Sequence, residues 1–286
     1  MSTTIMQGKP VAAVYRTRLK AKLTAAARQG EHVTLAILTV GDDPASAIYR
    51  TRLAKVAANT GAHVREIILA ATATQEQVLA AVRQLNNDPR ITGILPMMPL
   101  PPQLDANQVC AALAPAKDLD CLNPVNCGLL YLGQSAWGPC TPRACLALLD
   151  YYKINVSGKH VVIVGRSNVV GKPVALLLLQ RNATVTICHS KTANLPAILR
   201  EADIVIAAVG KAGFVKPEML RYGVILVDVG INALPGGVIV GDIAPECYDK
   251  AAAFTPVPGG VGTVCNMMVL ETLAKDVHVT EEQEHA

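Results

Sequence analysis

Short runs of aliphatic and β-branched residues alternate with helical segments along the chain, and this alternation restricts the fold more than any other feature. In the first half, strand-like runs cover residues 33–40, 63–69 and 91–98, and helical patterns cover 8–29, 43–61 and 74–88. Asp43 and Thr74 are suitable N-caps, and Gly61 is suitable at a helix end. Strands that alternate with helices are typical of a parallel sheet flanked by helices, so the sequence predicts the α/β class.

The pattern restarts near residue 146, which indicates a second domain. A turn and helix are expected over 167–182, and strand-like runs lie at 160–165, 184–188, 204–210, 224–230 and 237–242. We predict two domains, 1–147 and 148–286, each with a mostly parallel sheet flanked by helices, the second of the Rossmann type. The last helix, about 264–276, is expected to pack back on the first domain.

Composition excludes several functional classes. The net charge is only +4, and no Lys/Arg tract is present, which argues against binding nucleic acid. No apolar run approaches the roughly 18 residues that span a membrane, and no signal peptide is visible, so we expect a cytoplasmic protein without membrane partners. Five of the eight cysteines lie between Cys110 and Cys145, without a CxxC spacing or an intervening histidine, so no metal site is expected.

The pentapeptide "YRTRL" occurs twice, at Tyr15–Leu19 and at Tyr49–Leu53. The first copy fits the solvated basic face of a surface helix, and a match of this length does not establish a repeat. The second copy follows a Gly-Asp-Asp-Pro turn at the carboxyl end of a predicted strand. Ligands bind at that edge of open α/β sheets, so the second copy is a candidate site.

The segment "VVIVGRSNVVGKP" (161–173) predicts a strand, a tight turn and a helix start. It lacks G-x-G-x-x-G, but Gly165 allows a sharp turn, and the N–H groups of the helix start suit a pyrophosphate. The next strand ends without an acidic residue, and Arg166, Ser190 and Lys191 together suit a 2′-phosphate. This favours NADP over NAD, and a surface turn that is merely basic is the alternative.

Several motifs together resemble one family. "VGDDPASAIY", "GILPMMPLPPQLD", "KDLDCLNPVNCG", "GRSNVVGKP", "VILVDVGIN" and "TPVPGGVG" are similar, in order, to the NADP-dependent methylenetetrahydrofolate dehydrogenase/methenyltetrahydrofolate cyclohydrolase family. The resemblance implies two α/β domains with a cleft between them, with folate against the first and NADP against the second. It also implies oxidation of 5,10-methylenetetrahydrofolate, followed by hydrolysis of the methenyl product to 10-formyltetrahydrofolate.

The resemblance carries roles to individual positions. Tyr49 matches the family's active-site tyrosine, and Asp120 matches the aspartate that holds the pterin. The stretch containing Pro258, Gly259 and Gly260 matches the loop beside the folate. The cofactor positions that it implies are Gly165, Arg166, Ser167, Ser190 and Ile231.

Two positions depart from the family pattern. The family lysine four residues after the tyrosine is Leu53 here, and its glutamine partner is Met97; Arg52 lies beside that helix face but cannot cycle a proton. We therefore expect a dehydrogenase whose cyclohydrolase activity is weak or lost. A fully bifunctional enzyme, a paralogue with another substrate, and a non-catalytic NADP-binding protein are the alternatives. The resemblance and the apolar strand at 237–242 also predict a homodimer.

Overall fold

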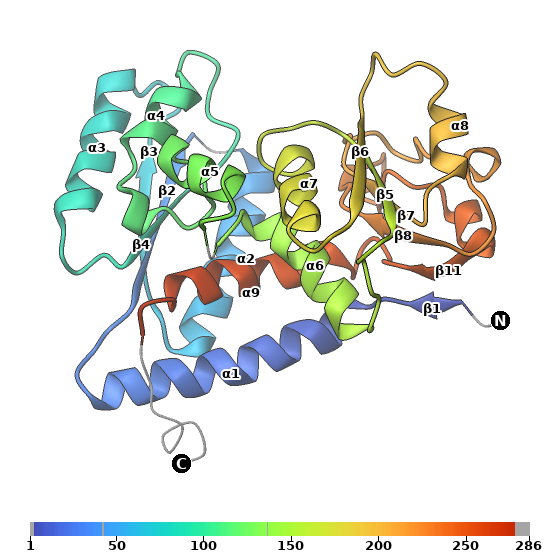
Figure 1. The fold of residues 1–286 in the computed structure, drawn as a ribbon. Coiled ribbons are helices and arrows are strands. Elements are labelled where there is room, and N and C mark those ends of the chain that lie inside the picture. Colours follow the sequence, from blue (N-terminus) through green and yellow to red (C-terminus); the bar gives the residue numbers. More distant parts are fainter. Residues whose placement is uncertain (1–2, 42, 136, 278–286) are drawn as a thin grey trace. The chain divides into compact units, whose positions relative to one another are not determined.

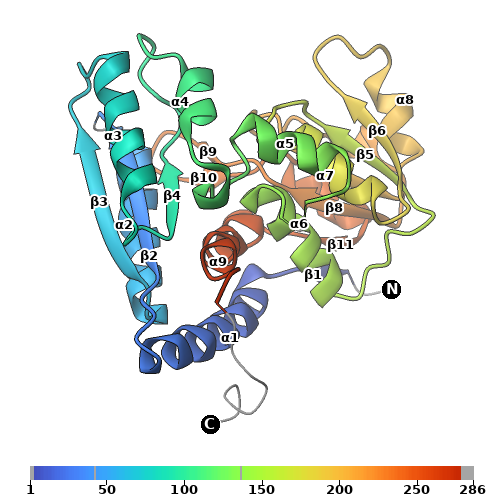
Figure 2. The same cartoon turned by 60° about the vertical axis from the view of Figure 1, so that its left-hand side comes forward.

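The computed structural model describes residues 3–41, 43–135 and 137–277 (Figures 1 and 2). The chain forms two compact units: one joins the N-terminal segment through Ala13 to Gly138–Met268, and the other joins Val14–Trp137 to the chain from Val269 onward. Helices α1 (Gly8–Arg28) and α9 (Val261–Leu273) therefore contribute to both units. Within the described ranges, no helix combines the length and apolar character needed to cross a bilayer.

The first unit is built on a six-stranded sheet in which every neighbouring pair is parallel. Its strands, in spatial order, are β1 (Thr4–Ile5), β11 (Ala251–Phe254), β8 (Val224–Asp228), β7 (Ile204–Ala207), β5 (His160–Val164) and β6 (Thr184–Cys188). The helical segments between them are α6 (Cys140–Tyr151), α7 (Gly171–Leu179), α8 (Leu195–Arg200), and the 3₁₀ turns η2 (Pro217–Met219) and η3 (Pro245–Lys250).

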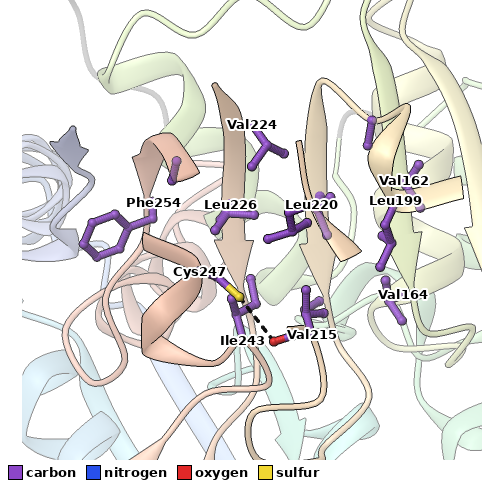
Figure 3. Packing of buried hydrophobic residues seen from close by; sticks show 14 of the residues in the cluster. Val162, Val164, Leu199, Val215, Leu220, Val224, Leu226, Ile243, Cys247 and Phe254 are labelled. Atoms are coloured by element: carbon purple, nitrogen blue, oxygen red, sulfur yellow. Dashed lines mark hydrogen bonds between the residues drawn. The ribbon is translucent and has the colours of Figure 1, made fainter. Parts of the chain in front are cut away.

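Both faces of the central strands are covered, which explains their near-continuous apolar sequence. On one face, Val162, Leu226 and their neighbours pack with Leu199 of α8 and Cys247 of η3 (Figure 3). The Cys247 thiol donates a hydrogen bond to the Val215 carbonyl at 3.4 Å, as the dashed line in Figure 3 marks. Residues of the opposite face, such as Ile163, are equally inaccessible to solvent. A parallel sheet with helices on both sides, as the sequence predicts, is therefore confirmed.

The prediction of a strand over 237–242 was largely wrong. Only β10 (Ile239–Val240) is extended, and it pairs antiparallel with β9 (Asn232–Ala233) in a separate two-stranded hairpin. Gly236 and Gly237 both adopt positive φ and turn the chain between these strands. Strands β1 and β11 were missed, because two residues and the alanine-rich segment 251–254 give no strand pattern.

The second unit contains a three-stranded parallel sheet with the order β3 (His63–Leu69), β2 (Thr34–Val40), β4 (Gly93–Pro96). Its helical segments are α2 (Pro44–Thr60), α3 (Gln75–Asn87), α4 (Ala106–Ala112), α5 (Pro124–Tyr131) and the 3₁₀ turn η1 (Pro115–Lys117). Asp43 caps α2 by accepting from the Ser46 N–H at 2.8 Å, and Gly61 ends it with φ of 97°. Thr74 forms a capping box with Gln77 at the start of α3. These predicted helix ends are confirmed.

Helices cover the two faces of this sheet separately. Ala36, Leu38 and Val40 of β2 point to the face that packs against α3, where Val78 and Val82 are fully buried. Successive strand residues alternate between faces, so Leu35, Ile37 and Thr39 point to the opposite face. Helix α2 lies on that opposite face, because its residue Arg50 pairs with Glu66 of β3, which is in register with Ile37.

Candidate active site

Each parallel sheet contains a point where the strand order reverses. In the first unit, β5 lies between β6 and β7, and in the second unit, β2 lies between β3 and β4. The connections that leave such a central strand on its two sides diverge and open a crevice at the carboxyl ends of the strands. The residues predicted for the site follow these strand ends.

The loop after β5 is shaped by two glycines. Gly165 has φ of 132°, and a Cβ there would collide with the carbonyl group of Ala208, which follows β7. A Cβ on Gly171 would collide with the carbonyl group of Gly165. The backbones on the two sides of the reversal point therefore approach too closely for side chains. This is the property that lets a backbone reach a phosphate group.

Ser167 organises the start of α7. Its Oγ accepts hydrogen bonds from the N–H groups of Val170 at 3.0 Å and Gly171 at 3.4 Å. The hydroxyl proton of Ser167 remains available to donate to an anion. Lys172 is held by Asn168 at 2.8 Å, and Arg166 is exposed. An anion at this loop would therefore meet a hydroxyl donor, the positive end of a helix and a guanidinium group.

The structure brings Arg166 and Ser190 to neighbouring strand ends. Val164 of β5 is in register with Cys188 of β6, and the Gly165 N–H donates to the Cys188 carbonyl at 2.9 Å. The turn that carries Ser190 is fixed by His189, whose backbone N–H donates to the Thr192 hydroxyl at 2.8 Å. Ser190 and Lys191 are exposed. The carboxyl end of β6, which is not followed by an acidic residue, thus presents polar and basic side chains beside Arg166.

Ile231 and the stretch Pro258–Gly260 lie near each other in the first unit. Ile231 follows β8, is 68% exposed, and its Cδ1 lies 3.6 Å from the position that a Cβ of Gly262 would occupy. The Gly259 carbonyl accepts from the Gly8 N–H at 2.7 Å, and the Gly260 carbonyl accepts from Thr263 at 3.1 Å. Both predicted segments therefore flank the start of α9, and the 258–260 loop is anchored from its backbone.

Two buried carboxylates, which the sequence did not single out, hold the Ile231 loop. Asp228 accepts from the N–H groups of Gly230, Asp242 and Ile243 at 2.8–2.9 Å. Asp242 accepts from three consecutive N–H groups, 209–211, and from the Asn232 amide. Burial raises the pKa of Asp228 to about 6, although its backbone donors act in the opposite direction. In the sequence, the aspartates of "VDVGIN" and "IVGD" are the signals that could have identified this pair.

In the second unit, α2 places Tyr49 and Leu53 one turn apart. Tyr49 is half-buried, whereas Leu53 and Ala57 are fully buried and share a helix face with Arg50, which reaches Glu66 of β3. Arg52, which the sequence places beside this helix face, is exposed. Arg50 instead turns toward the sheet, where its Nε lies 3.1 Å from Glu66. The sheet-facing side of α2 is therefore apolar at Leu53.

Asp120 is carried by a segment that continues the sheet beyond β4. Asp118 forms a parallel bridge with Ile94, and the Leu119 N–H donates to the Ile94 carbonyl at 3.4 Å. This register places half-buried Asp120 level with the carboxyl end of β4, which Met97 follows. Asp118, which the sequence did not single out, is buried and accepts hydrogen bonds that fold the loop, from the N–H groups of 120, 122 and 123 and from the Asn126 amide.

The predicted residues thus form two groups. The structure brings Tyr49, Leu53, Met97 and Asp120 to one side of the second unit's sheet or to its carboxyl edge. It brings the remaining positions to the carboxyl edge of the first unit's sheet, namely Gly165, Arg166, Ser167, Ser190, Ile231 and Pro258–Gly260. The predicted folate loop at 258–260 belongs to the same unit as the predicted cofactor residues.

Two family models match the chain. Residues 6–120 match the catalytic domain of tetrahydrofolate dehydrogenase/cyclohydrolase, and residues 139–281 match the NAD(P)-binding domain of the same family.

Relatives match the chain over nearly its whole length. The bifunctional protein FolD 2 of Geobacter sulfurreducens is 45% identical over 93% of this chain and 94% of its own. The bifunctional protein FolD of Herpetosiphon aurantiacus is 48% identical over 90% of each chain. The crystal structure of the FolD enzyme of Campylobacter jejuni superposes with a TM-score of 0.94 at 39% identity, covering 96% of this chain and 98% of that one. The Trypanosoma brucei enzyme, solved with NADP and an inhibitor, gives a TM-score of 0.91 at 34% identity, covering 96% and 97%. This chain belongs to the tetrahydrofolate dehydrogenase/cyclohydrolase family.

Proposed function

We propose that the protein is a bifunctional enzyme that oxidises 5,10-methylenetetrahydrofolate with NADP and hydrolyses the methenyl product. The main support is the near-complete match to bifunctional relatives at 45% and 48% identity. The structural support is that Tyr49 and Asp120 belong to one strand-order reversal point and the phosphate-type loop to the other. The comparisons thus favour the bifunctional alternative over the expectation from sequence that hydrolysis is weak or lost.

The first unit has a backbone that fits NADP. The close approach at Gly165, the start of α7 and the basic side chain of Arg166 suit the pyrophosphate, and Arg166 with Ser190 suits the 2′-phosphate. NADP, when bound, supplies the acceptor for the hydride of the methylene carbon. In this proposal the first unit binds NADP, and the folate contacts Tyr49 and Asp120 of the second unit and the 258–260 loop of the first.

The folate side requires few catalytic groups for the hydride step. The Asp120 carboxylate suits the amino and ring N–H groups of a pterin, and the Tyr49 ring suits its flat face. The substrate nitrogens stabilise the cation that forms at the methylene carbon, so the residues of this chain need only align the folate and exclude water. Hydrolysis is more demanding, because a water molecule must be positioned and protons must move.

A second candidate is a dehydrogenase with weak hydrolysis. Leu53 is fully buried and Met97 is 6% exposed, and both occupy positions where the family pattern has a lysine and a glutamine. Neither side chain can polarise water or carry a proton. The same change leaves the hydride step intact, since that step depends on alignment and dryness rather than on proton transfer.

One pair of assays tests both candidates. The oxidation is followed by NADPH absorbance with methylenetetrahydrofolate, and the hydrolysis is followed separately by decay of the methenyl chromophore, corrected for the buffer rate. Enzyme-dependent decay at a rate comparable to oxidation supports the bifunctional enzyme. Decay at the buffer rate with normal oxidation supports the second candidate. Absence of both activities contradicts the assignment.

We also propose a homodimer formed through the first unit. Hairpin residues Leu234 and Val238 are 41% and 56% exposed, and apolar side chains in this position suit a self-complementary contact across a two-fold axis. Light scattering at micromolar concentration should give about twice the chain mass of 30.1 kDa. A monomeric mass would contradict the proposal.

A further inference from the structure

The side chain of Thr39 is an unusual feature of the second unit's sheet. Thr39 lies in β2, one residue before the strand ends, and is only 4% exposed. Its hydroxyl oxygen makes no hydrogen bond to any residue that the structure describes. A buried hydroxyl group without a partner is destabilising, and in native proteins such groups are usually satisfied by water or by a ligand.

The register of the sheet places Thr39 beside Met97. Leu38 is paired with Pro96, and the Met97 N–H donates to the Leu38 carbonyl at 2.8 Å, so the ladder continues to the next pair, Thr39 and Met97. Paired residues of parallel strands point to the same face, and for Thr39 that is the face on which α2 lies. Thr39 and Met97 are therefore neighbours at the strand-order reversal between β2 and β4.

The surroundings of Thr39 on this face are mostly apolar. Leu53 points from α2 toward the sheet and is fully buried, and Leu95 of β4 is 5% exposed. Strand β3, the other neighbour of β2, places Glu66 on this face two residues before Ile68, the partner of Thr39, and Glu66 is paired with Arg50 of α2. The Thr39 hydroxyl is thus a polar group among the side chains that stand where the family pattern has its lysine and glutamine.

We propose that the Thr39 hydroxyl positions the water molecule that hydrolyses the methenyl carbon. The inference rests on the hydrolase half of the proposed function. The water oxygen bonds to the methenyl carbon and releases one proton to solvent; its second proton passes to the adjacent ring nitrogen as the bond between that nitrogen and the carbon breaks. Thr39 takes no proton. It accepts a hydrogen bond from the water, and this bond holds the water oxygen with a lone pair toward the methenyl carbon, so Thr39 is a positioning residue.

The test compares Thr39→Val, which keeps the shape and removes the hydroxyl, with Thr39→Ser, which keeps the hydroxyl. Thr60→Val is the matched control, because Thr60 is also buried in this unit but donates to the carbonyl groups of Val56 and Ala57. Oxidation and hydrolysis are measured separately for each purified protein, with kcat and KM resolved, and thermal midpoints are recorded.

We expect Thr39→Val to lower kcat of hydrolysis by about 10- to 100-fold, with KM and the oxidation rate changed by less than about 3-fold. Thr39→Ser should retain most of the hydrolysis. The thermal midpoint should not fall in Thr39→Val, whereas it should fall in Thr60→Val with both activities retained.

Two results overturn the inference while leaving the proposed function intact. Hydrolysis by Thr39→Val at the wild-type rate shows that the hydroxyl is not used. An equal loss of both activities together with a lower thermal midpoint shows a structural role. Failure of the proposed hydrolase activity is recognised separately, because it is measured on the unmodified protein. If the methenyl compound decays there at the buffer rate, the protein does not catalyse the hydrolysis and the inference falls with it.

Discussion

Exchanging Leu53 and Met97 for the lysine and glutamine of the family pattern tests whether these two positions meet. Leu53 is fully buried, so Leu53→Lys loses the burial of an aliphatic side chain and leaves an ammonium group without a partner, at a cost of about 3–5 kcal/mol. Met97→Gln buries an amide beside the Thr39 hydroxyl, which can satisfy only part of its hydrogen-bonding capacity, at a cost of about 1–3 kcal/mol. In the double variant, the ammonium donates to the amide oxygen, and this charge-assisted bond should recover about 1.5–3 kcal/mol.

Urea unfolding of the four proteins of this cycle measures the coupling free energy. The matched control replaces Met97→Gln by Leu95→Gln, a buried position two residues earlier on the same face of β4, where coupling to Leu53→Lys should stay below about 0.5 kcal/mol. The double variant should also hydrolyse the methenyl compound faster than either single variant. A coupling energy below about 0.5 kcal/mol for positions 53 and 97 would falsify the claim that they face each other.

Three further predictions concern the first unit. Arg166→Ala should weaken NADP binding by about 1.5–3 kcal/mol in titrations, with a much smaller effect on NAD; equal losses for both would contradict the 2′-phosphate assignment. Asp242→Asn should lower the free energy of unfolding by about 2–4 kcal/mol, because the amide that replaces one carboxylate oxygen opposes N–H donors; chemical denaturation measures this, and a loss below 1 kcal/mol would count against the network. The raised pKa of Asp228, about 6 against 3.8 unfolded, means that the folded state holds the proton more tightly. The contribution of Asp228 to the free energy of unfolding should therefore be fully present below about pH 4 and decline by up to about 3 kcal/mol as the pH rises through 6. Asp228→Asn should remove this pH dependence of the unfolding free energy.

Local signals in the sequence predicted most of the secondary structure. The N-caps Asp43 and Thr74 and the C-terminal Gly61 act within a few residues, so their effect is readable from the neighbouring sequence. The strand predicted at 237–242 was largely wrong because the apolar run does not reveal that Gly236 and Gly237 turn the chain into a short hairpin. Short strands such as β1 exist only through pairing with β11, which lies at the other end of the sequence.

The candidate site was harder to predict where the partners are distant in the chain. Arg50 and Arg52 are both arginines and lie two residues apart, so the sequence does not show which of them turns toward the sheet. Arg50 does so because it pairs with Glu66, which is distant in the chain. Asp118 looks like an ordinary turn acid until the bridge to Ile94 places it in the core. Thr39 lies inside an apolar run, where a threonine is an unremarkable strand residue, and only register places it beside Met97.

The two compact units are not contiguous in the gene. Strand β1, at the beginning of the chain, pairs with β11, and Arg18 and Lys275 join the early and late parts of the other unit through Glu271 and the Ala116 carbonyl at 2.8 Å. A single crossover between two homologous genes near residue 138 would therefore combine, within each unit, segments from both parents. Chimaeras that exchange one whole unit need three junctions, near residues 13, 138 and 268, and two of these fall inside helices α1 and α9. Recombination in this family should thus favour inheritance of the chain as one piece.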